Sequence, residues 1–456
     1  MTFWQSPLVA TLVTLAGLLA LGGVLRSRIP ALRRLAVPAC ILAGLLGLAL
    51  GPDGADVLPV DRGTLESLVY HGLGIVFIAV ALQSPPKGGG AVGPGAKAFS
   101  FGIPVMVSLQ AAVGLAVVVA LGLLGTSTHP GLGLLLPMGF EQGPGQALSL
   151  GTAWETSGLV DGGQLGLIIA AVGFLWSIVV GVPLVAWGKR KGLLAPVPSG
   201  AAEVAVEASP EAPPGSLDRM TGQVALIGVC YVLTWGACTA LSSALAGMPD
   251  IAAIVWGFHF ILGAAIAMGV RALLVRLAPE ALDDEPLRRV AGVVVDWMTA
   301  GALVAVQLAV LSANWLPILL VTTIGGVVTL GACLWLCSRA FPEAPFEHAI
   351  VWFGMSTGTL PLGLSLLRVV DPELRSPAAL SAVIGSAGAI LGVVPVLLVL
   401  VPMTVSAHAS GNPNAALLAL GAVVAYLGVL LAAWRFGGAL RFGGKGLWAK
   451  GGGEGP

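Results

Sequence analysis

The stretch from Gly139 to Glu155, GFEQGPGQALSLGTAWE, separates two long apolar segments and contains four glycines and Pro144. Glycine leaves the backbone free to turn and proline removes an amide donor, so this stretch cannot continue as one regular helix. A second interruption, Gly354 to Arg368 (GMSTGTLPLGLSLLR), lies in the other half of the chain. Such backbone is tolerated at membrane depth only where protein buries it or where it lines a watery cavity. Paired interruptions in two halves indicate the binding site of a transporter.

The composition predicts an all-α polytopic membrane protein. The 456 residues are 57% hydrophobic and only 10% charged, with a mean hydropathy of +0.96, whereas a soluble domain is about 25% charged. Apolar runs of roughly 20 residues cross a hydrocarbon layer about 30 Å thick. We expect about 11 spanning helices, at 7–25, 35–51, 65–84, 99–125, 163–188, 220–247, 251–277, 289–311, 315–340, 377–403 and 415–435.

The composition also limits the classes of function. The net charge is zero, which argues against a nucleic-acid partner. The sequence has no zinc-protease, nucleophile-elbow or phosphate-loop motif, so we expect neither an enzyme nor a resident cofactor or metal. The expected partners are the lipid bilayer and a small anionic substrate.

The distribution of basic residues predicts the orientation. When the chain is threaded through these helices, every Lys and Arg except Arg62 falls at one face of the membrane. The positive-inside rule makes that face cytoplasmic. We therefore expect a multi-pass protein of the bacterial inner membrane with its N-terminus outside and its C-terminus in the cytoplasm.

The same threading predicts an inverted repeat of two five-helix halves. Each half contains a re-entrant hairpin, because the second half starts from the opposite face. Three glycine pairs fall at one separation, namely Gly139 with Gly354, Gly143 with Gly358, and Gly173 with Gly388. The predicted parts are the first repeat (1–188) with a hairpin at about 131–160, a flexible cytoplasmic linker (189–219), the second repeat (220–403) with a hairpin at about 345–370, and an extra helix with a disordered tail (404–456).

The tips of the two hairpins are predicted to meet near the middle of the membrane. Short helices that end there expose unpaired amides or carbonyls, which hold an anionic substrate or a cation. The alternative is that both stretches are ordinary loops in water. The candidate substrate-binding residues lie at the two tips: Gly143, Pro144, Gly145, Gln146, Ser356, Thr357, Gly358 and Thr359.

Isolated polar residues suggest a cation site. Glu141 needs a partner, a proton or a cation if it lies at membrane depth, and the alternative puts it in water at the outer mouth of the hairpin. Asp296 is interpreted as a residue that begins a helix on the cytoplasmic side, while Gln110 and His259 are interpreted as packing residues. The candidate cation-binding residues are Glu141, Gln142, Asp296, Gln307, Thr322 and Thr323.

The two interrupted stretches resemble paired motifs of the sodium/glutamate symporter family, within the wider group that includes the 2-hydroxycarboxylate symporters. The closer likeness is FGMSTGTLPLGLSLLRVVDPELRSPAA, Phe353 to Ala379. The resemblance implies a Na⁺-coupled carrier of glutamate or a similar small carboxylate that works by an elevator-like movement, usually as a homodimer. Where glutamate carriers of that family typically read Gly-Gly-His-Gly-Thr, this chain has Glu-Gln-Gly-Pro-Gly from Glu141, so the substrate stays open.

Three functions therefore remain open. The first is a secondary transporter coupled to Na⁺ or H⁺, and the second is a binding or sensing protein that kept the fold without transporting. The third is a channel for a small anion.

Overall fold

The computed structural model describes residues 6–34, 37–84, 93–126, 128–195, 218–247, 252, 255–372, 374–438 and 440. Across these residues the chain forms helices and no strand, which confirms the all-α class. The predicted linker lies outside the described residues from 196 to 217, as does the tail from 441. The helices of the first half are α1 (Pro7–Arg28), α2 (Pro30–Arg34), α3 (Ala39–Leu50), α4 (Arg62–Leu82), α5 (Pro94–Leu123), α6 (Pro130–Pro137), the π-helix η2 (Met138–Gln142), α7 (Pro144–Glu155), α8 (Gly162–Val179) and α9 (Gly181–Lys191).

The second half contains helices of similar length. They are α10 (Arg219–Ala244), α12 (His259–Leu277), the short η3 (Pro279–Ala281), α13 (Asp284–Val304), α14 (Leu308–Ala313), α15 (Trp315–Ala340), α16 (Pro345–Leu367), α17 (Pro377–Pro395), the π-helix η4 (Val396–Leu400), α18 (Val401–Ala409) and α19 (Ala415–Phe436).

Capping side chains and prolines explain where many of these helices begin. Asp61 caps α4 by accepting a hydrogen bond of 2.7 Å from the Thr64 amide, because the first amides of a helix lack partners within it. Pro94 and Pro377 begin α5 and α17, where the missing amide hydrogen costs nothing and the ring fixes a helical φ. The helix starts thus follow local sequence signals.

Ten helices within the described residues are long and apolar enough to cross a membrane, which confirms a multi-pass membrane protein. This set differs from the 11 predicted spans at four places, one of which is the tenth span, placed at Gly388–Ala409 and not at 377–403. It includes Pro345–Leu367, which the sequence analysis treats as a hairpin, and it omits α3 and α13. α3 has only 12 residues, about 18 Å of helix, and α13 carries charged residues in its first turns.

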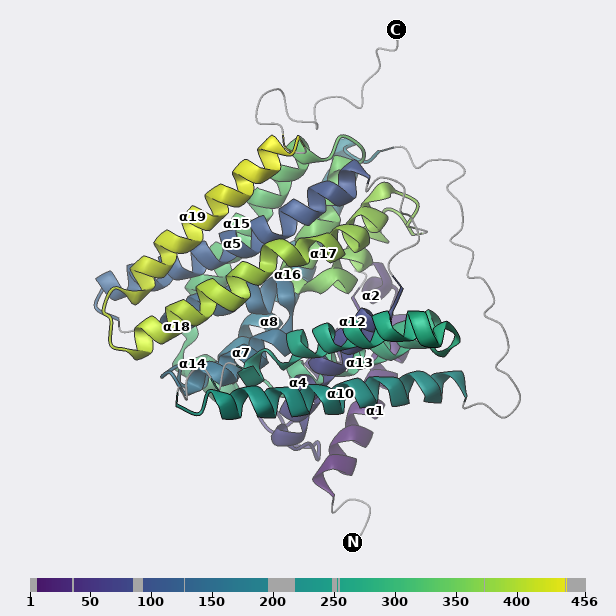
Figure 1. Ribbon diagram of the computed structural model, residues 1–456. Helices are drawn as coiled ribbons and strands as arrows, with labels where there is room; N and C mark the ends of the chain where they lie inside the picture. The colour runs from purple at the N-terminus through teal and green to yellow at the C-terminus, as the bar shows by residue number, and fades with distance from the viewer. Residues whose placement is uncertain are drawn as a thin grey trace.

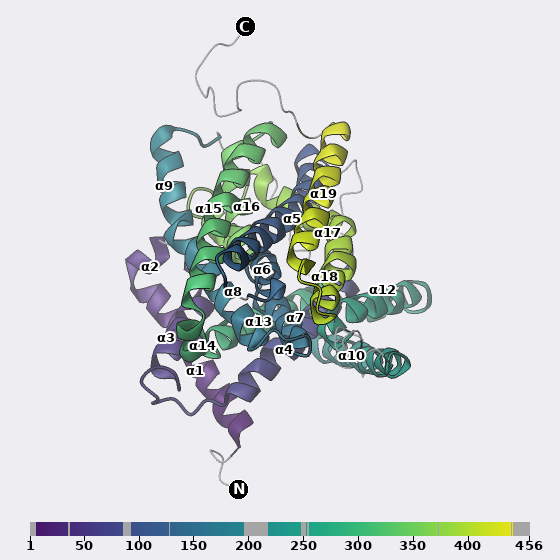
Figure 2. The ribbon, with the colours of Figure 1, turned by 90° about the vertical axis from the view of Figure 1, so that its left-hand side faces the viewer.

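The helices form two groups that Figures 1 and 2 show from two sides. In one group, α5 packs against α15, α17 and α19, and α8 packs against α16. In the other, α4 packs against α12 and α13, while α3 packs against α1 and α13, and α10 against α12. α7 contacts α8 of the first group and α4 of the second. The interrupted stretch around Gly143 therefore lies between the two groups.

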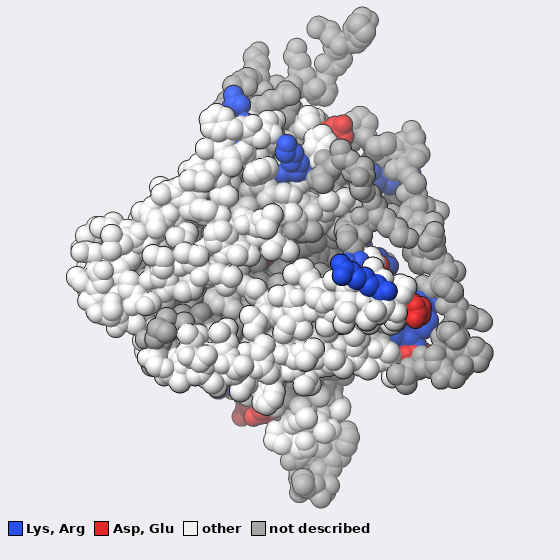
Figure 3. Space-filling view, in the orientation of Figure 1, with Lys and Arg blue, Asp and Glu red and all other residues white. Residues whose placement is uncertain are grey.

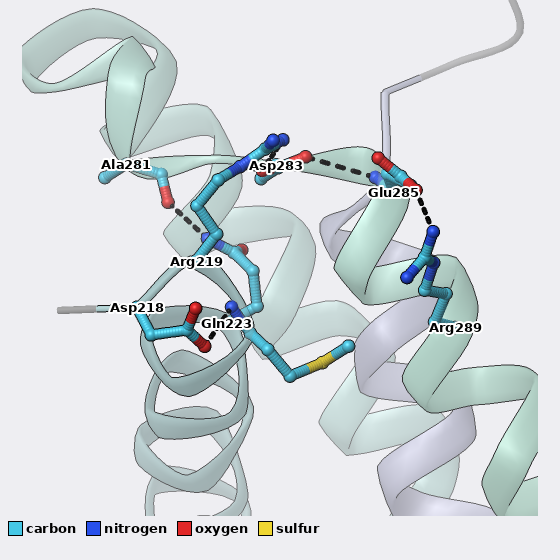
Figure 4. Close-up of polar contacts among 8 residues, drawn as sticks. Asp218, Arg219, Gln223, Ala281, Asp283, Glu285 and Arg289 are labelled. Carbon is cyan, nitrogen blue, oxygen red and sulfur yellow. Dashed lines mark hydrogen bonds and ion pairs between the residues drawn. The ribbon is translucent and has the colours of Figure 1, made fainter. Parts of the chain in front are cut away.

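On the face shown in Figure 3, charged side chains lie at the margins. The broad central area of the face in Figure 3 carries no Lys, Arg, Asp or Glu, and the coloured side chains lie toward its edges. At one such edge an ion pair between Arg219 and Asp283 joins the start of α10 to that of α13, and Gln223 donates a 2.8 Å hydrogen bond to the Ala281 carbonyl (Figure 4). A broad uncharged surface with an ion pair outside it is typical of a protein surrounded by lipid.

The segment Pro345–Leu367, named here the second broken segment, folds back on itself. Gly358 and Thr359 have non-helical backbone angles. A Cβ atom on Gly354 would lie 2.7 Å from the Cα atom of Gly363, although nine residues of straight helix would separate these positions by about 13 Å. The two arms therefore pack against each other through glycine, since no larger residue fits that approach.

The segment Pro130–Glu155, named here the first broken segment, also folds back. His129 precedes its first helix and Ser157 follows its last, yet the His129 Nε2 atom lies 3.2 Å from the Ser157 carbonyl oxygen. The turn between the arms falls at Gly143, where φ is +92°. Both ends of this segment therefore lie together, at a distance from its turn.

The close contact between the arms of the second broken segment predicts opposite effects for two alanine substitutions. Gly363→Ala should destabilise the protein by about 1–3 kcal/mol, because its Cβ atom would overlap the Val351 carbonyl oxygen. Gly331→Ala on α15, where nothing lies within 4 Å, should stabilise it by up to about 1 kcal/mol through helix propensity. Thermal unfolding in detergent measures both. Equal effects of the two variants would contradict the packing of the arms.

Candidate functional site

The turn of the first broken segment follows from its local sequence around Gly143 and Pro144. The π-helical turn Met138–Gln142 ends at Gly143, whose φ of +92° and ψ of 177° suit a residue without a Cβ atom. Pro144 then begins α7, where no amide hydrogen is needed. π-Turns of this kind are often found at functional sites. The local sequence thus produces a helix end and a helix start side by side.

The second broken segment turns at the residues that the sequence analysis indicated, but with a different backbone. Gly358 has a φ of −166°, which any residue can adopt, and the left-handed residue is Thr359, with a φ of +74° and a ψ of 162°. This conformation is costly for a β-branched residue, by roughly 1–3 kcal/mol, and such outliers cluster at ligand sites and switch regions. Thr359 therefore repeats the backbone conformation of Gly143 at the cost of strain.

The two turns meet. A Cβ atom on Gly143 would lie 2.7 Å from the Thr359 Cγ2 atom, and one on Gly173 of α8 would lie 2.5 Å from the Thr357 carbonyl oxygen. Ser356, Thr357 and Gly358 are buried, and Thr359 is half-buried. Gly143, Pro144, Gly145 and Gln146 are likewise buried at the start of α7. The structure thus brings the eight predicted substrate-binding residues to one place, inside protein and not in loops in water.

Glu141 lies inside this assembly and not at a watery mouth. Only 7% of its surface is exposed, and neither carboxylate oxygen has a hydrogen-bond partner among the described residues. The Ser356 hydroxyl of the second broken segment is a neighbour of the carboxylate, but the two groups do not meet the geometry of a hydrogen bond. The Cys333 thiol of α15 interacts with Glu141 electrostatically. Glu141 is therefore a buried acidic group without a protein counter-ion among the described residues.

The neighbouring glutamines extend the polar cluster. Gln146 donates a 3.0 Å hydrogen bond from Nε2 to the Gln142 Oε1 atom. The Gln146 Oε1 atom is buried and has no partner among the described residues, and Gln142 is only half-buried. Gln142 and Gln146 thus lie one helical turn apart across the break, with an amide oxygen free to accept a hydrogen bond.

Gln110 of α5, interpreted from sequence as a packing residue, is part of the site. Its side chain is 1% exposed, and its Nε2 atom donates to the Ser356 carbonyl oxygen at 2.8 Å and to the Thr329 hydroxyl of α15 at 3.0 Å. Its Oε1 atom has no partner among the described residues. Gln110 thus binds a carbonyl freed by the break. The sequence signal that could have indicated this role was a glutamine in a mainly apolar helix.

The other predicted cation ligands lie elsewhere. Asp296 lies in the middle of α13, exposed and beside Cys40, so it does not begin a helix as predicted. The backbone amide of Gln307 donates a hydrogen bond of 3.1 Å to the Gln164 Oε1 atom. Thr322 is buried but donates its hydroxyl to its own helix at the Ile318 carbonyl (2.7 Å), and Thr323 is exposed. Helical periodicity separates these two threonines, so neighbours in sequence cannot share one face.

Two histidines meet where the first broken segment begins and ends. The His129 Nδ1 atom accepts a 2.9 Å hydrogen bond from the Gly131 amide, which caps α6, while Nε2 faces the Ser157 carbonyl. The rings of His129 and His408 lie 4.3 Å apart. His129 is in the connection between α5 and α6, where burial and the nearby His408 lower its pKa from 6.5 to about 4. The neutral ring thus closes the base of the segment.

This pKa predicts a pH-dependent stability. Because the folded-state pKa lies below the unfolded value, the contribution of His129 is fully present above pH 6.5 and is lost as the pH falls toward about 4. His129→Asn can still cap α6 but does not titrate. The thermal midpoint of the wild type minus that of His129→Asn should therefore fall across this pH range. A difference that stays constant with pH would contradict the assignment.

Comparison with known proteins adds no further identification: no protein-family model and no curated protein matches the chain.

Proposed function

We propose that the protein is a secondary active transporter that carries a small carboxylate across the membrane together with a cation. The observation that carries the proposal is the meeting of two broken segments at Gly143 and Thr359, inside the protein. Helix starts at such a break offer amides with about half a positive charge to an anionic group. The resemblance noted above indicates glutamate or a similar substrate, and Na⁺ as a coupling ion.

The packing of the helices supports an inverted repeat. The contact of α1 with α3 is matched by that of α10 with α12. The contact of α4 with α12 is matched by that of α13 with α3. These pairs correspond if α1, α3 and α4 of the first repeat are equivalent to α10, α12 and α13 of the second. Each repeat then continues into a broken segment. In this proposal the segments are re-entrant hairpins that enter the membrane from opposite faces.

The separation into two helix groups supports an elevator-like movement. The broken segments pack with α8 and α5, while α4 and α13 belong to the other group, and α7 contacts α4 and α13 across the boundary. A polar contact at this boundary joins Gln164 Nε2 of α8 to Glu66 Oε1 of α4 at 2.6 Å. In the proposed cycle the group that contains the broken segments, α5 and α8 carries the substrate past the group that contains α4 and α13. The latter group forms the homodimer in the inner membrane.

The re-entrant arrangement predicts the sides from which introduced cysteines react. Leu124→Cys and Val160→Cys flank the first broken segment at exposed positions, and both should react with an impermeant maleimide from outside. Glu343→Cys and Arg368→Cys flank the second and are exposed, and both should react only from the cytoplasm. The native cysteines among the described residues are buried, which keeps the background low.

Reaction of the Glu343→Cys and Arg368→Cys variants from opposite sides would contradict this arrangement. It would mean that the second broken segment crosses the membrane.

The function itself is tested by uptake into proteoliposomes. A panel of labelled mono- and dicarboxylates, offered with a Na⁺ or H⁺ gradient, should reveal a substrate whose uptake saturates and depends on the gradient. Gly143→Val should lower that uptake by more than about tenfold, because valine suits neither a φ of +92° nor the contact with Thr359. Gly125→Val is the matched control, since Gly125 has a φ of +86° and open space around it.

Each alternative has its own result. Flux that does not saturate would identify a channel, and ligand binding without uptake would identify a sensor. Full uptake by Gly143→Val would remove the meeting turns from the mechanism.

A further inference from the structure

The site contains one acidic group that the proposed substrate does not need. A carboxylate substrate is repelled by an ionised carboxylate and attracted by helix starts. Glu141 nevertheless lies one residue before Gln142 and two before the turn at Gly143, in the interior of the protein. Either an ion neutralises it or the substrate meets it in a neutral form.

No basic side chain of the described helices around it is positioned to neutralise Glu141. η2 packs against α6, α7, α8 and α16, and these four helices contain no Lys or Arg. Their titratable residues, Glu155, Glu347 and His348, lie at the far ends of the broken segments. On α5 the nearest basic residue, Lys97, is 13 positions from Gln110, about 20 Å along a helix. On α15 Arg339 is 6 positions from Cys333, about 9 Å along the helix, and its guanidinium stacks on Trp335 and donates to the Trp335 carbonyl and the Ser338 hydroxyl. The ionisable group that interacts electrostatically with Glu141 is the Cys333 thiol of α15.

A proton on the carboxylate needs fewer partners than Na⁺ does. An alkali cation needs several oxygen ligands to replace its hydration shell. The Ser356 carbonyl accepts a hydrogen bond from Gln110 Nε2 at 2.8 Å, and the Thr357 hydroxyl donates to the Phe353 carbonyl at 2.8 Å, but each oxygen keeps a free lone pair. The Cys333 sulfur is a soft ligand that suits other metals. Among the unpartnered oxygens of the site, which include Gln110 Oε1 and Gln146 Oε1, the Ser356 hydroxyl is the one with an interaction to the carboxylate.

A proton needs only one acceptor, and Ser356 supplies it. Its hydroxyl is fully buried and has no hydrogen-bond partner among the described residues. Glu141 comes from the first broken segment and Ser356 from the second, each two residues after the matched glycines Gly139 and Gly354. A protonated Glu141 can donate to the Ser356 hydroxyl and link the two segments. An ionised Glu141 needs Ser356 to donate instead.

We propose that Glu141 is a proton-binding site between the two broken segments, with Ser356 as the group that senses its protonation. The inference rests on the proposed transporter and specifies it: a proton accompanies the carboxylate, whether or not Na⁺ binds elsewhere. Gln110 is a positioning residue, because it holds the Ser356 carbonyl without contacting the carboxylate in the hydrogen bonds observed. The proton makes the site neutral when the anionic substrate arrives.

Infrared spectroscopy of the purified full-length protein in lipid tests this without a known substrate. A carbonyl-stretch component of a protonated carboxylic acid should be present in the wild type at neutral pH, lost in Glu141→Gln, and unchanged when K⁺ is replaced by Na⁺. Glu155→Gln is the control, because Glu155 lies on the same broken segment but is exposed. That variant should retain the band. Ser356→Ala should shift the band, since it removes the acceptor.

Three results would overturn the proposal. The first is the absence of the band throughout the pH range in which the wild type is folded, and the second is its loss on addition of Na⁺, which would make Glu141 a sodium ligand. The third is an unshifted band in Ser356→Ala. If Glu141→Gln does not fold, the pH titration of the wild-type band in K⁺ and in Na⁺ still decides the first two. A band that behaves as expected in a protein that transports no carboxylate would refute the transporter and leave the proton site intact.

Discussion

The constraint on which the structure depends is the need of freed backbone groups for partners. Breaking a helix leaves carbonyls and amides that water cannot satisfy in an apolar environment. Here the two breaks are placed against each other and against α8, and Gln110 donates to the carbonyl of Ser356. The rest of the bundle encloses this arrangement. The close approach of the arms at Gly354 and Gly363 and the cap at His129 hold each broken segment folded back.

The same constraint makes the buried polar groups informative. A purely structural core satisfies its polar atoms, since an unpaired buried atom costs about 1–3 kcal/mol. In this site the Glu141 carboxylate, the Ser356 hydroxyl and the Gln110 and Gln146 amide oxygens have no partner among the described residues. They come from both broken segments and from α5. Such a cluster is expected where a transported molecule or ion supplies the missing partners.

The sequence predicted the class of fold and the position of both breaks, because composition and Gly/Pro content act locally. Apolar runs located most of the long helices to within about five residues, although α13 ends at Val304 and not near 311, and GPG at Gly143 located the first turn. Tertiary contacts could not be predicted from the sequence. Nothing local marks Thr359, and not Gly358, as the left-handed residue, or directs Gln110 toward Ser356. Asp296 was misplaced because charge in α13 hid the true start of that helix.

The way in which the turns meet bears on the choice between a carrier and a channel. A channel needs a continuous wet path lined by its selective groups, whereas Gly143 and Thr359 are packed against each other and Gln146, Ser356 and Thr357 are buried around them. A solute can therefore pass only if the helices that hold the turns move. In the proposed cycle that movement takes place at the boundary crossed by α7, where polar contacts such as that of Gln164 with Glu66 need to break. This favours transport by a moving domain over conduction through a fixed pore.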